Sequence, residues 1–408
     1  MLIGGIAFGV NPQETGDLQR LMTGSACMRA SDAIRMFQDR IGGVMGIQGS
    51  DLIINRADLS DARLRAAVFP DTPPEGHVLL RVDQFALTAN TITYGTATDS
   101  LGYWNFFPVP EEGFGRIPAW GFADVVASSH PDVAVGVRVY GYVPMSTHLM
   151  VAPGKVSADG FSDKTAHRQP MSPIYNRYTF THADPGYAPE AEAQIALFRP
   201  LFITSFLLAD FFRKNNMFGA KRLMMSSASS KTALGLAAEM ARHTAEDAEI
   251  VGFTSAGNLD FVRGLDLYDR VLAYADAADL PRDPSVYVDF SGNGDFTFAL
   301  HSHFGDRMQH SAQVGVTDWE NANSRVPGLP GPKPQFFFAP SYAQERIADW
   351  GMDGFQGRLS EAWNAFMDKI AWLDVVEHRG TDAARERYLS ALAGQFDPSQ
   401  GDMVRMQA

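Results

Sequence analysis

Hydrophobic and polar positions alternate with a short period between about residues 51 and 155. Apolar runs are separated by turn residues such as Pro73-Pro74 and Glu75-Gly76, and they include HVLLRVDQFAL (77–87), GFADVVASS (121–129) and VGVRVYGYVP (135–144). Runs of this length that end at Pro, Gly and polar clusters are typical of strands. The pattern predicts an antiparallel β domain, followed from about 156 to 192 by an irregular surface excursion rich in Pro and polar residues.

The period becomes helical after Ala191. QIALFRPLFITSFLLADFFRK (194–214) predicts a long apolar helix. Beyond it, the short apolar runs KRLMM, EIVGFT, RVLAY, VYVDF and QHSAQVGVT alternate with helical segments near 231–243, 259–264 and 295–304. Strands that alternate with helices indicate a doubly wound parallel sheet, whose ligand crevice lies at the carboxyl ends of the strands.

The predicted fold class is therefore α/β, with a β domain and a doubly wound parallel-sheet domain. FFFAP (336–340) adds one more predicted strand, and two helical stretches lead to the C-terminus. We expect an N-terminal extension over residues 1–50, a β domain over 51–192, the doubly wound domain over 193–365 and a C-terminal segment over 366–408.

Composition narrows the choice of partners. The 408 residues are 45% hydrophobic and carry a net charge of −13, which disfavours nucleic acid and anionic membranes as partners. The single cysteine excludes an intrachain disulfide and a four-cysteine zinc site, and it suits a reducing compartment. The apolar N-terminus lacks a basic leader, and no charge-free run is long enough for a membrane span, so we expect a cytoplasmic protein.

Small hydroxyl residues fill the turn between the first predicted parallel strand and its helix. Groups of this kind at a helix N-terminus bind phosphate oxygens, although serine is also a preferred helix cap without any ligand. A P-loop is disfavoured because Met225 and Ser230 stand where it needs glycine, even though Asp289 matches the acid that would hold magnesium. The candidate phosphate-binding residues are Ser227, Ala228, Ser229, Ser230, Lys231 and Thr232.

The end of the second predicted parallel strand carries no carboxylate. NAD-selective sites place an acid there to bind the ribose 2′-hydroxyl, whereas this chain has Thr254, Ser255 and Asn258. Small donors tolerate a 2′-phosphate, and Lys231 adds a positive charge. The expected cofactor is therefore NADPH rather than NADH, with a solvent-facing Lys231 as the alternative interpretation.

This arrangement resembles the medium-chain dehydrogenase/reductase superfamily, on its quinone-oxidoreductase side, and in particular a divergent, DUF2855-like branch with a serine-rich cofactor turn. The resemblance runs from about residue 52 to 405. It implies a GroES-like β-barrel catalytic domain, a Rossmann dinucleotide-binding domain, a C-terminal return to the catalytic domain, and a homodimer. The segments that carry the resemblance are 77–95, 116–128, 135–144, 226–235, 288–294 and 336–346.

Two departures from the family pattern concern the cofactor turn and the metal. The turn has no glycine until Gly235, where the family pattern is AxxGxxG. The Gly-His-Glu motif of zinc-dependent members is replaced by Gly121-Phe122-Ala123, and the cysteine ligands are absent. His301 and His303 are spaced to face different sides of a helix, so we predict no metal site and zinc-independent chemistry.

A reductase without a metal polarises its acceptor by hydrogen bonds and supplies a proton from a hydroxyl or water. Asn90, Thr93 and Tyr94 match the family's substrate-and-nicotinamide loop, and Tyr94 is the first choice as proton donor or carbonyl-orienting group. Its alternative role is packing beside the cofactor. The family also brings backbone close to the cofactor at Ser291, Gly292, Phe338 and Ala339.

Tyr103, Trp104 and Phe106 belong to one run of aromatics in a loop flanked by Gly and Pro. Such a run predicts the wall or lid of an apolar acceptor pocket, with core packing as the alternative. We therefore expect an NADPH-dependent, zinc-independent oxidoreductase that transfers hydride to an activated C=C or C=O of a small apolar quinone, enone or aldehyde. The alternative is a non-catalytic NADP(H)-binding redox sensor or partner-binding relative.

Overall fold

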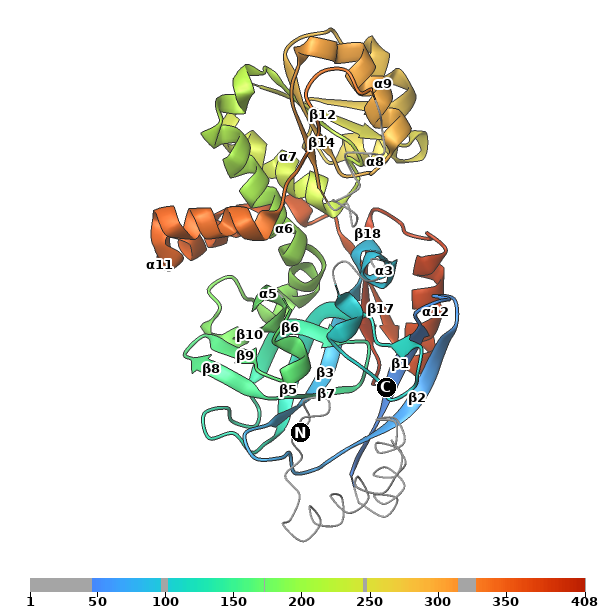
Figure 1. Cartoon of the computed structure of the whole chain (residues 1–408), viewed down its shortest axis with the longest axis vertical. Helices are drawn as coiled ribbons and strands as arrows, with labels where there is room; N and C mark the ends of the chain where they lie inside the picture. Colours follow the sequence, from blue (N-terminus) through green and yellow to red (C-terminus); the bar gives the residue numbers. More distant parts are fainter. Residues whose placement is uncertain (1–45, 97–101, 172, 245–247, 315–327, 408) are drawn as a thin grey trace, which may run out of the picture. The chain divides into compact units, whose positions relative to one another are not determined.

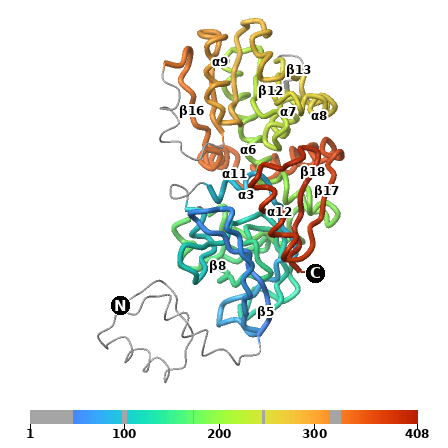
Figure 2. The backbone as a smooth tube through the Cα atoms, turned by 90° about the vertical axis from the view of Figure 1, so that its right-hand side faces the viewer, coloured from blue at the N-terminus to red at the C-terminus, as the bar shows by residue number. Residues whose placement is uncertain are grey.

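The computed structural model describes residues 46–96, 102–171, 173–244, 248–314 and 328–407 (Figures 1 and 2). The chain forms two compact units. The first runs up to Ala196 and also takes in Val375–Phe396 and the residues from Asp402 onward. The second comprises Leu197–Asp374 and Asp397–Gly401. The doubly wound domain expected from the sequence covered residues 193–365. Most of the expected N-terminal extension, residues 1–45, lies outside the described residues.

The first unit is built on antiparallel strands. One sheet has the order β17-β18-β3-β5-β6-β10-β9-β8, with β7 also paired to β3, and a smaller sheet has the order β2-β1-β4. The strands are β1 Ile47–Asn55, β2 Ala62–Phe69, β3 Val78–Leu87, β4 Phe114–Gly115, β5 Pro118–Ser128, β6 Arg138–Pro144, β7 His148–Val151, β8 Pro153–Ser157, β9 Gly160–Asp163, β10 Arg177–Phe180, β17 Asp374–Arg379 and β18 Gln400–Arg405.

The runs 77–87, 121–129 and 135–144 form β3, β5 and β6, so these three predicted strands are confirmed. The stretch 156–192 is not the irregular excursion that we expected, because it contributes β9 and β10 and the end of β8 to the sheet. Its alternating pattern is short and interrupted by polar residues, and pairing with β6 supplies the order that the local pattern lacks.

The helical segments of the first unit are short except near the C-terminus. After α12, β18 pairs antiparallel with β3, with Asp402 opposite Leu87, so residues close to the C-terminus complete the sheet of this unit. The helical segments are α3 Ala89–Thr96, η1 Tyr103–Asn105, η2 Ala166–Arg168, α5 Pro173–Asn176, η3 Thr181–Ala183, η4 Pro189–Ala191 and α12 Thr381–Leu392.

The second unit is a parallel six-stranded sheet in the order β13-β12-β11-β14-β15-β16. The central strand β11 is buried at every position, as expected where helices cover both faces. The predicted α/β class, with an antiparallel β domain and a doubly wound parallel sheet, is confirmed. The strands are β11 Arg222–Met225, β12 Glu249–Thr254, β13 Arg270–Ala273, β14 Ser285–Asp289, β15 Met308–Gln313 and β16 Gln335–Phe336.

Helices lie on both faces of the parallel sheet. Figure 1 shows α7 and α9 on opposite sides of the strands β12 and β14. The helices are α6 Glu192–Lys214, which begins in the first unit, α7 Lys231–Thr244, α8 Leu259–Gly264, α9 Gly294–Phe304 and α11 Ala339–Met367. Shorter 3-10 turns are η5 Asn216–Gly219, η6 Ala256–Asn258, η7 Tyr274–Asp279, η8 Gly305–Arg307 and η9 Asp368–Ile370.

The stretch Pro189–Lys214 is the one helical span among the described residues that is long and apolar enough to cross a bilayer. Of its most apolar window, 61% is buried inside the protein. Within the second unit, Phe202 stacks on Phe366 with ring centroids 4.7 Å apart and contacts Trp363 edge-on at 5.5 Å. The apolar surface of this helix is therefore explained by packing in the protein core.

Candidate functional site

The carboxyl ends of β11 and β14 lie side by side in the second unit, since Met225 pairs with Val288. The strand order reverses between these two strands. In doubly wound sheets, ligands bind at the carboxyl edge at such a reversal point. The serine-rich turn that follows β11 therefore occupies the ligand-binding position of the fold.

Ser226 and Asp289 join the two strand ends. The buried Ser226 hydroxyl donates to Asp289 Oδ1 at 2.8 Å and accepts from the backbone N–H of Ser291 at 3.1 Å. The same carboxylate oxygen accepts from the backbone N–H of Ser291 at 2.9 Å and of Gly292 at 3.1 Å. The two N–H groups that we expected near the cofactor are thus already bonded to Asp289. The sequence did not indicate that Asp289 accepts hydrogen bonds from this loop.

The first part of the turn is also internally bonded. Ser227 has a φ of 49°, in the left-handed region, and its N–H donates to the Tyr274 hydroxyl at 2.9 Å. Ala228 is buried, and its N–H donates to the carbonyl of Phe253 at 2.9 Å. Ser227 and Ala228 therefore shape the turn with their backbone, much as glycine does in related turns.

The second part of the turn meets the end of β12. Asn258 Nδ2 donates to the Ser229 hydroxyl at 3.1 Å, so two candidate residues from separate turns lie together. Ser230 accepts from the N–H of Ala233 at 3.3 Å, which is the geometry of a helix cap. At the end of β12, Thr254 is buried whereas Ser255 is exposed.

Lys231 and Thr232 form the first residues of α7. Lys231 Nζ lies 3.5 Å from the carbonyl oxygen of Gln400 and 5.4 Å from the ring centroid of Phe198. The backbone carbonyl of Thr232 accepts a hydrogen bond from Ser205 Oγ at 2.7 Å, and this bond does not involve the Thr232 side chain. The positive end of the α7 dipole coincides with this lysine, so the position favours an anion.

Phe338 and Ala339 lie at the start of α11, just beyond the edge strand β16. The Phe338 side chain is half exposed and stacks on Phe336 with ring centroids 6.1 Å apart. Ala339 is the first residue of the helix.

Tyr94 lies on α3 in the first unit, 8% exposed. Burial raises the pKa of its hydroxyl well above the usual value, and the polar groups of Trp120, Asn90 and Tyr142 offset that effect in part. Among the other two α3 candidates, Asn90 is half-buried beside Tyr94, and Thr93 donates its hydroxyl to the carbonyl of Ala89 at 3.2 Å. Tyr94 is therefore a protonated hydrogen-bond donor across the physiological pH range.

Three aromatic residues that the sequence analysis did not select gather around Tyr94. Tyr142 lies 5.7 Å from Tyr94 between ring centroids, 5.1 Å from Trp120 and 4.8 Å from Tyr175. The Tyr142 hydroxyl is buried without a hydrogen-bond partner among the described residues. Trp120 and Tyr142 are paired positions on β5 and β6, so strand pairing was the signal that could have identified them.

The aromatic run after Gly102 packs into the core of the first unit. Trp104 and Phe106 are 5% and 1% exposed, while the half-buried Tyr103 lies 4.6 Å from Tyr94 between ring centroids. The Tyr103 and Tyr175 hydroxyls are 3.2 Å apart. Of the three predicted substrate residues, Tyr103 is the one in direct ring contact with Tyr94.

The described residues contain no group of three His, Cys, Asp or Glu side chains arranged to hold a metal ion. The histidine pair on α9 is engaged elsewhere, because His301 bonds to Ser311 Oγ at 3.0 Å and His303 to the carbonyl of Leu280 at 2.8 Å.

A parallel sheet together with an antiparallel unit completed by C-terminal strands is the architecture that the resemblance noted in the sequence implies. The chain belongs to the family described as "Protein of unknown function (DUF2855)", whose model matches residues 85–397. A comparison with curated proteins found no match.

Solved structures with the same fold cover nearly the whole chain. CurA from Vibrio vulnificus in complex with NADPH has a TM-score of 0.57 at 14% identity, over 89% of this chain and 100% of CurA. The quinone oxidoreductase from Coxiella burnetii has a TM-score of 0.52 at 10% identity, over 88% and 99%. TarJ from S. aureus in complex with NADPH has a TM-score of 0.50 at 11% identity, over 88% and 99%. At these identities the likeness establishes the fold.

Proposed function

We propose that the chain is an NADPH-dependent oxidoreductase of the medium-chain type that acts without zinc. It transfers hydride to an activated C=C or C=O bond of a small apolar acceptor, such as a quinone, enone or aldehyde. The observation that carries this proposal is the hydroxyl-rich turn at the point where the strand order reverses between β11 and β14. Two neighbours of the same fold, CurA and TarJ, were crystallised with NADPH, which supports the proposal.

The residues of the turn fit a dinucleotide with a reduced set of donors. Ser229, Lys231 and Thr232 at the start of α7 would hold the phosphates. The Ser226 hydroxyl is bonded to Asp289, the Ser227 N–H to Tyr274, and Ser230 caps α7. Ser255 and Asn258 would lie near a ribose 2′-phosphate. When bound, the nicotinamide supplies the hydride.

The first unit would hold and polarise the acceptor. The Tyr94 hydroxyl, with Asn90 beside it, would donate a hydrogen bond to the acceptor oxygen. Burial raises the pKa of Tyr94, so donating a hydrogen bond costs less than forming a buried phenolate. We further propose a cytoplasmic homodimer with small-molecule substrates, as is usual in such relatives.

The direct test combines nucleotide titration with an acceptor panel. Fluorescence titration is expected to show tighter binding of NADPH than of NADH, and at least one quinone, enone or aldehyde should oxidise NADPH catalytically. Nucleotide binding without turnover on any acceptor would favour the alternative, a redox sensor. Failure to bind either nucleotide would exclude both.

A carboxylate at the exposed Ser255 should reverse the nucleotide preference. Ser255→Asp is expected to weaken NADPH binding at least about tenfold, because the new charge would repel a 2′-phosphate, and to spare or strengthen NADH binding. The matched control Ser255→Asn has the same size without the charge and should retain the preference for NADPH. Equal losses for both nucleotides in the aspartate variant would refute the assignment of the 2′-phosphate site.

A further inference from the structure

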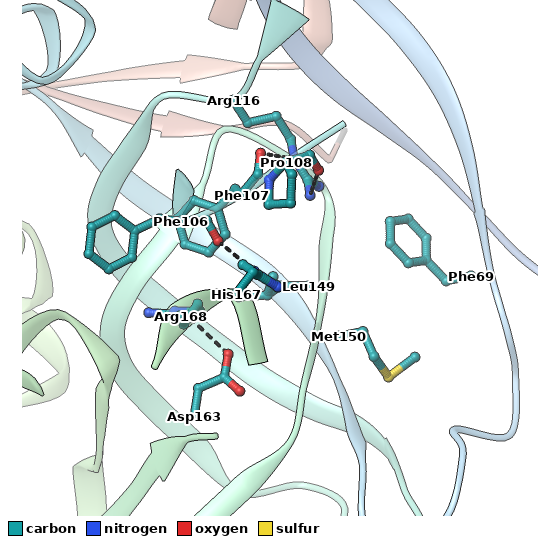
Figure 3. A pocket seen from close by; sticks show the side chains of 10 residues that line it. All are labelled: Phe69, Phe106, Phe107, Pro108, Arg116, Leu149, Met150, Asp163, His167 and Arg168. Atoms are coloured by element: carbon teal, nitrogen blue, oxygen red, sulfur yellow. Dashed lines mark hydrogen bonds and ion pairs between the residues drawn. The ribbon is translucent and has the colours of Figure 1, made fainter. Parts of the chain in front are cut away.

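The first unit contains a cavity of about 170 Å³ that the proposed chemistry does not use (Figure 3). Its walls come from segments far apart in the sequence, the end of β2, the loop after η1, β7 and η2. Figure 3 shows Phe69 and Met150 facing Phe107 and His167 across the open space. Leu149 also lines the cavity. Asn90, Thr93 and Tyr94 are not among its lining residues.

The charged groups in the cavity wall are already paired. The Arg168 guanidinium donates to Asp163 Oδ2 at 3.0 Å and to the Tyr178 hydroxyl at 2.9 Å. The Arg116 guanidinium donates to Asp51 Oδ1 at 3.2 Å and to the carbonyl of Pro108 at 3.1 Å. Both guanidinium groups therefore already contact a carboxylate, although Asp51 also pairs with Arg65, and neither is left as an unpaired cation for an ionic ligand.

His167 provides an unused acceptor beside this apolar space. Its Nε2 lies 3.1 Å from the carbonyl oxygen of Phe106. A carbonyl oxygen only accepts, so Nε2 carries the proton. Burial lowers the pKa of His167, so the ring is neutral at pH 7 and Nδ1 is left without a proton. Nδ1 has no hydrogen-bond partner among the described residues, and it can accept a hydrogen bond from a ligand.

The volume limits the ligand to about one six-membered ring, because an apolar cavity of about 150 Å³ binds benzene. We infer that this cavity binds one small, uncharged aromatic molecule that carries a hydroxyl group, of the phenol class. The ring lies among Phe69, Phe107 and Leu149, and the hydroxyl donates to His167 Nδ1. Because both guanidinium groups are already paired, the wall disfavours carboxylated rings, and the Nδ1 acceptor favours a donor group on the ligand.

Phenol itself is the probe, titrated calorimetrically into the full-length protein without nucleotide. Saturable binding of one phenol per chain is expected, with toluene weaker and benzoate not bound. His167→Leu should weaken phenol about tenfold and leave toluene unchanged, since it removes one hydrogen bond and little apolar surface. Because no nucleotide is present, failure of this test leaves the proposed reductase activity untouched.

Two filling variants and one control locate the site. Leu149→Phe places bulk in the cavity, and Met150→Trp does so at its half-buried edge, so each should abolish phenol binding. Val135→Phe adds similar bulk at a position that is 61% exposed and should bind phenol like the unmodified chain. Thermal unfolding verifies that each variant folds. Absence of saturable binding to the unmodified chain, benzoate binding as tight as phenol, or full phenol affinity in a folded filling variant would overturn the inference.

Discussion

Tyr94→Phe is expected to lower kcat/KM for a carbonyl acceptor by about 10²–10³-fold, the effect of removing one donor to a developing oxyanion. The Kd for NADPH should not change, because the proposed phosphate-binding residues belong to the turn after β11. The phenylalanine ring retains the contacts with Tyr103 and Tyr142 and removes only the hydroxyl. Steady-state kinetics with the best acceptor of the panel, together with nucleotide titration, measure both quantities.

Tyr187→Phe is the matched control for this prediction. Its hydroxyl donates to Glu192 in the same unit and is not in ring contact with Tyr94, so kcat/KM should stay near that of the unmodified enzyme. An unchanged kcat/KM in Tyr94→Phe would make Tyr94 a packing residue.

The pH profile gives a second measurement on the same residue. Burial raises the pKa of Tyr94, so its hydroxyl remains protonated as the pH rises through 10.0, where an ordinary tyrosine ionises. Any loss of activity near that pH in the unmodified enzyme should therefore persist in Tyr94→Phe. A falling limb near pH 10 that disappears in the variant would show that the hydroxyl ionises normally.

Asp289→Ala is expected to lower the free energy of unfolding by about 3–5 kcal/mol. The carboxylate is 2% exposed, and its Oδ1 accepts from the Ser226 hydroxyl and from the N–H groups of Ser291 and Gly292. Alanine removes this acceptor at the ends of β11 and β14, and the Ser291 N–H keeps only its bond to the Ser226 hydroxyl. Chemical denaturation measures the loss, and NADPH affinity should fall with it because the turn loses its shape.

Asp289→Asn is the control, since the amide oxygen can replace Oδ1 as the acceptor for this loop. We expect a loss of about 1 kcal/mol, the magnitude of one altered hydrogen bond. Equal stability of the alanine and asparagine variants would show that the Asp289 hydrogen bonds contribute little to folding.

Much of the fold could be predicted from local pattern. The helix expected near 231–243 is α7, and the strands expected at EIVGFT and RVLAY are β12 and β13. Such segments are long or strongly apolar, so their period survives without knowledge of their neighbours. The segments β9 and β10 could not be predicted, since their order depends on pairing with β6.

The candidate site was predicted less completely. Serine-rich composition marks the turn after β11, but composition does not tell a hydroxyl that is free to meet a ligand from one that is already bonded. Trp120 and Tyr142 could not be selected from the sequence either. A buried aromatic in a strand has the same local pattern whether or not it lies beside Tyr94.

The sequence by itself determined the alternation of strands and helices, the position of the hydroxyl-rich turn and the absence of the family's zinc motif, since each depends on residues close together in the chain. Tertiary structure alone decided what each serine of the turn contacts. Ser226 is occupied by Asp289, 63 residues away, whereas Ser229 meets Asn258 from the neighbouring turn. Hydrogen bonds between distant residues form only after the sheet has brought the strand ends together, so no local pattern encodes them.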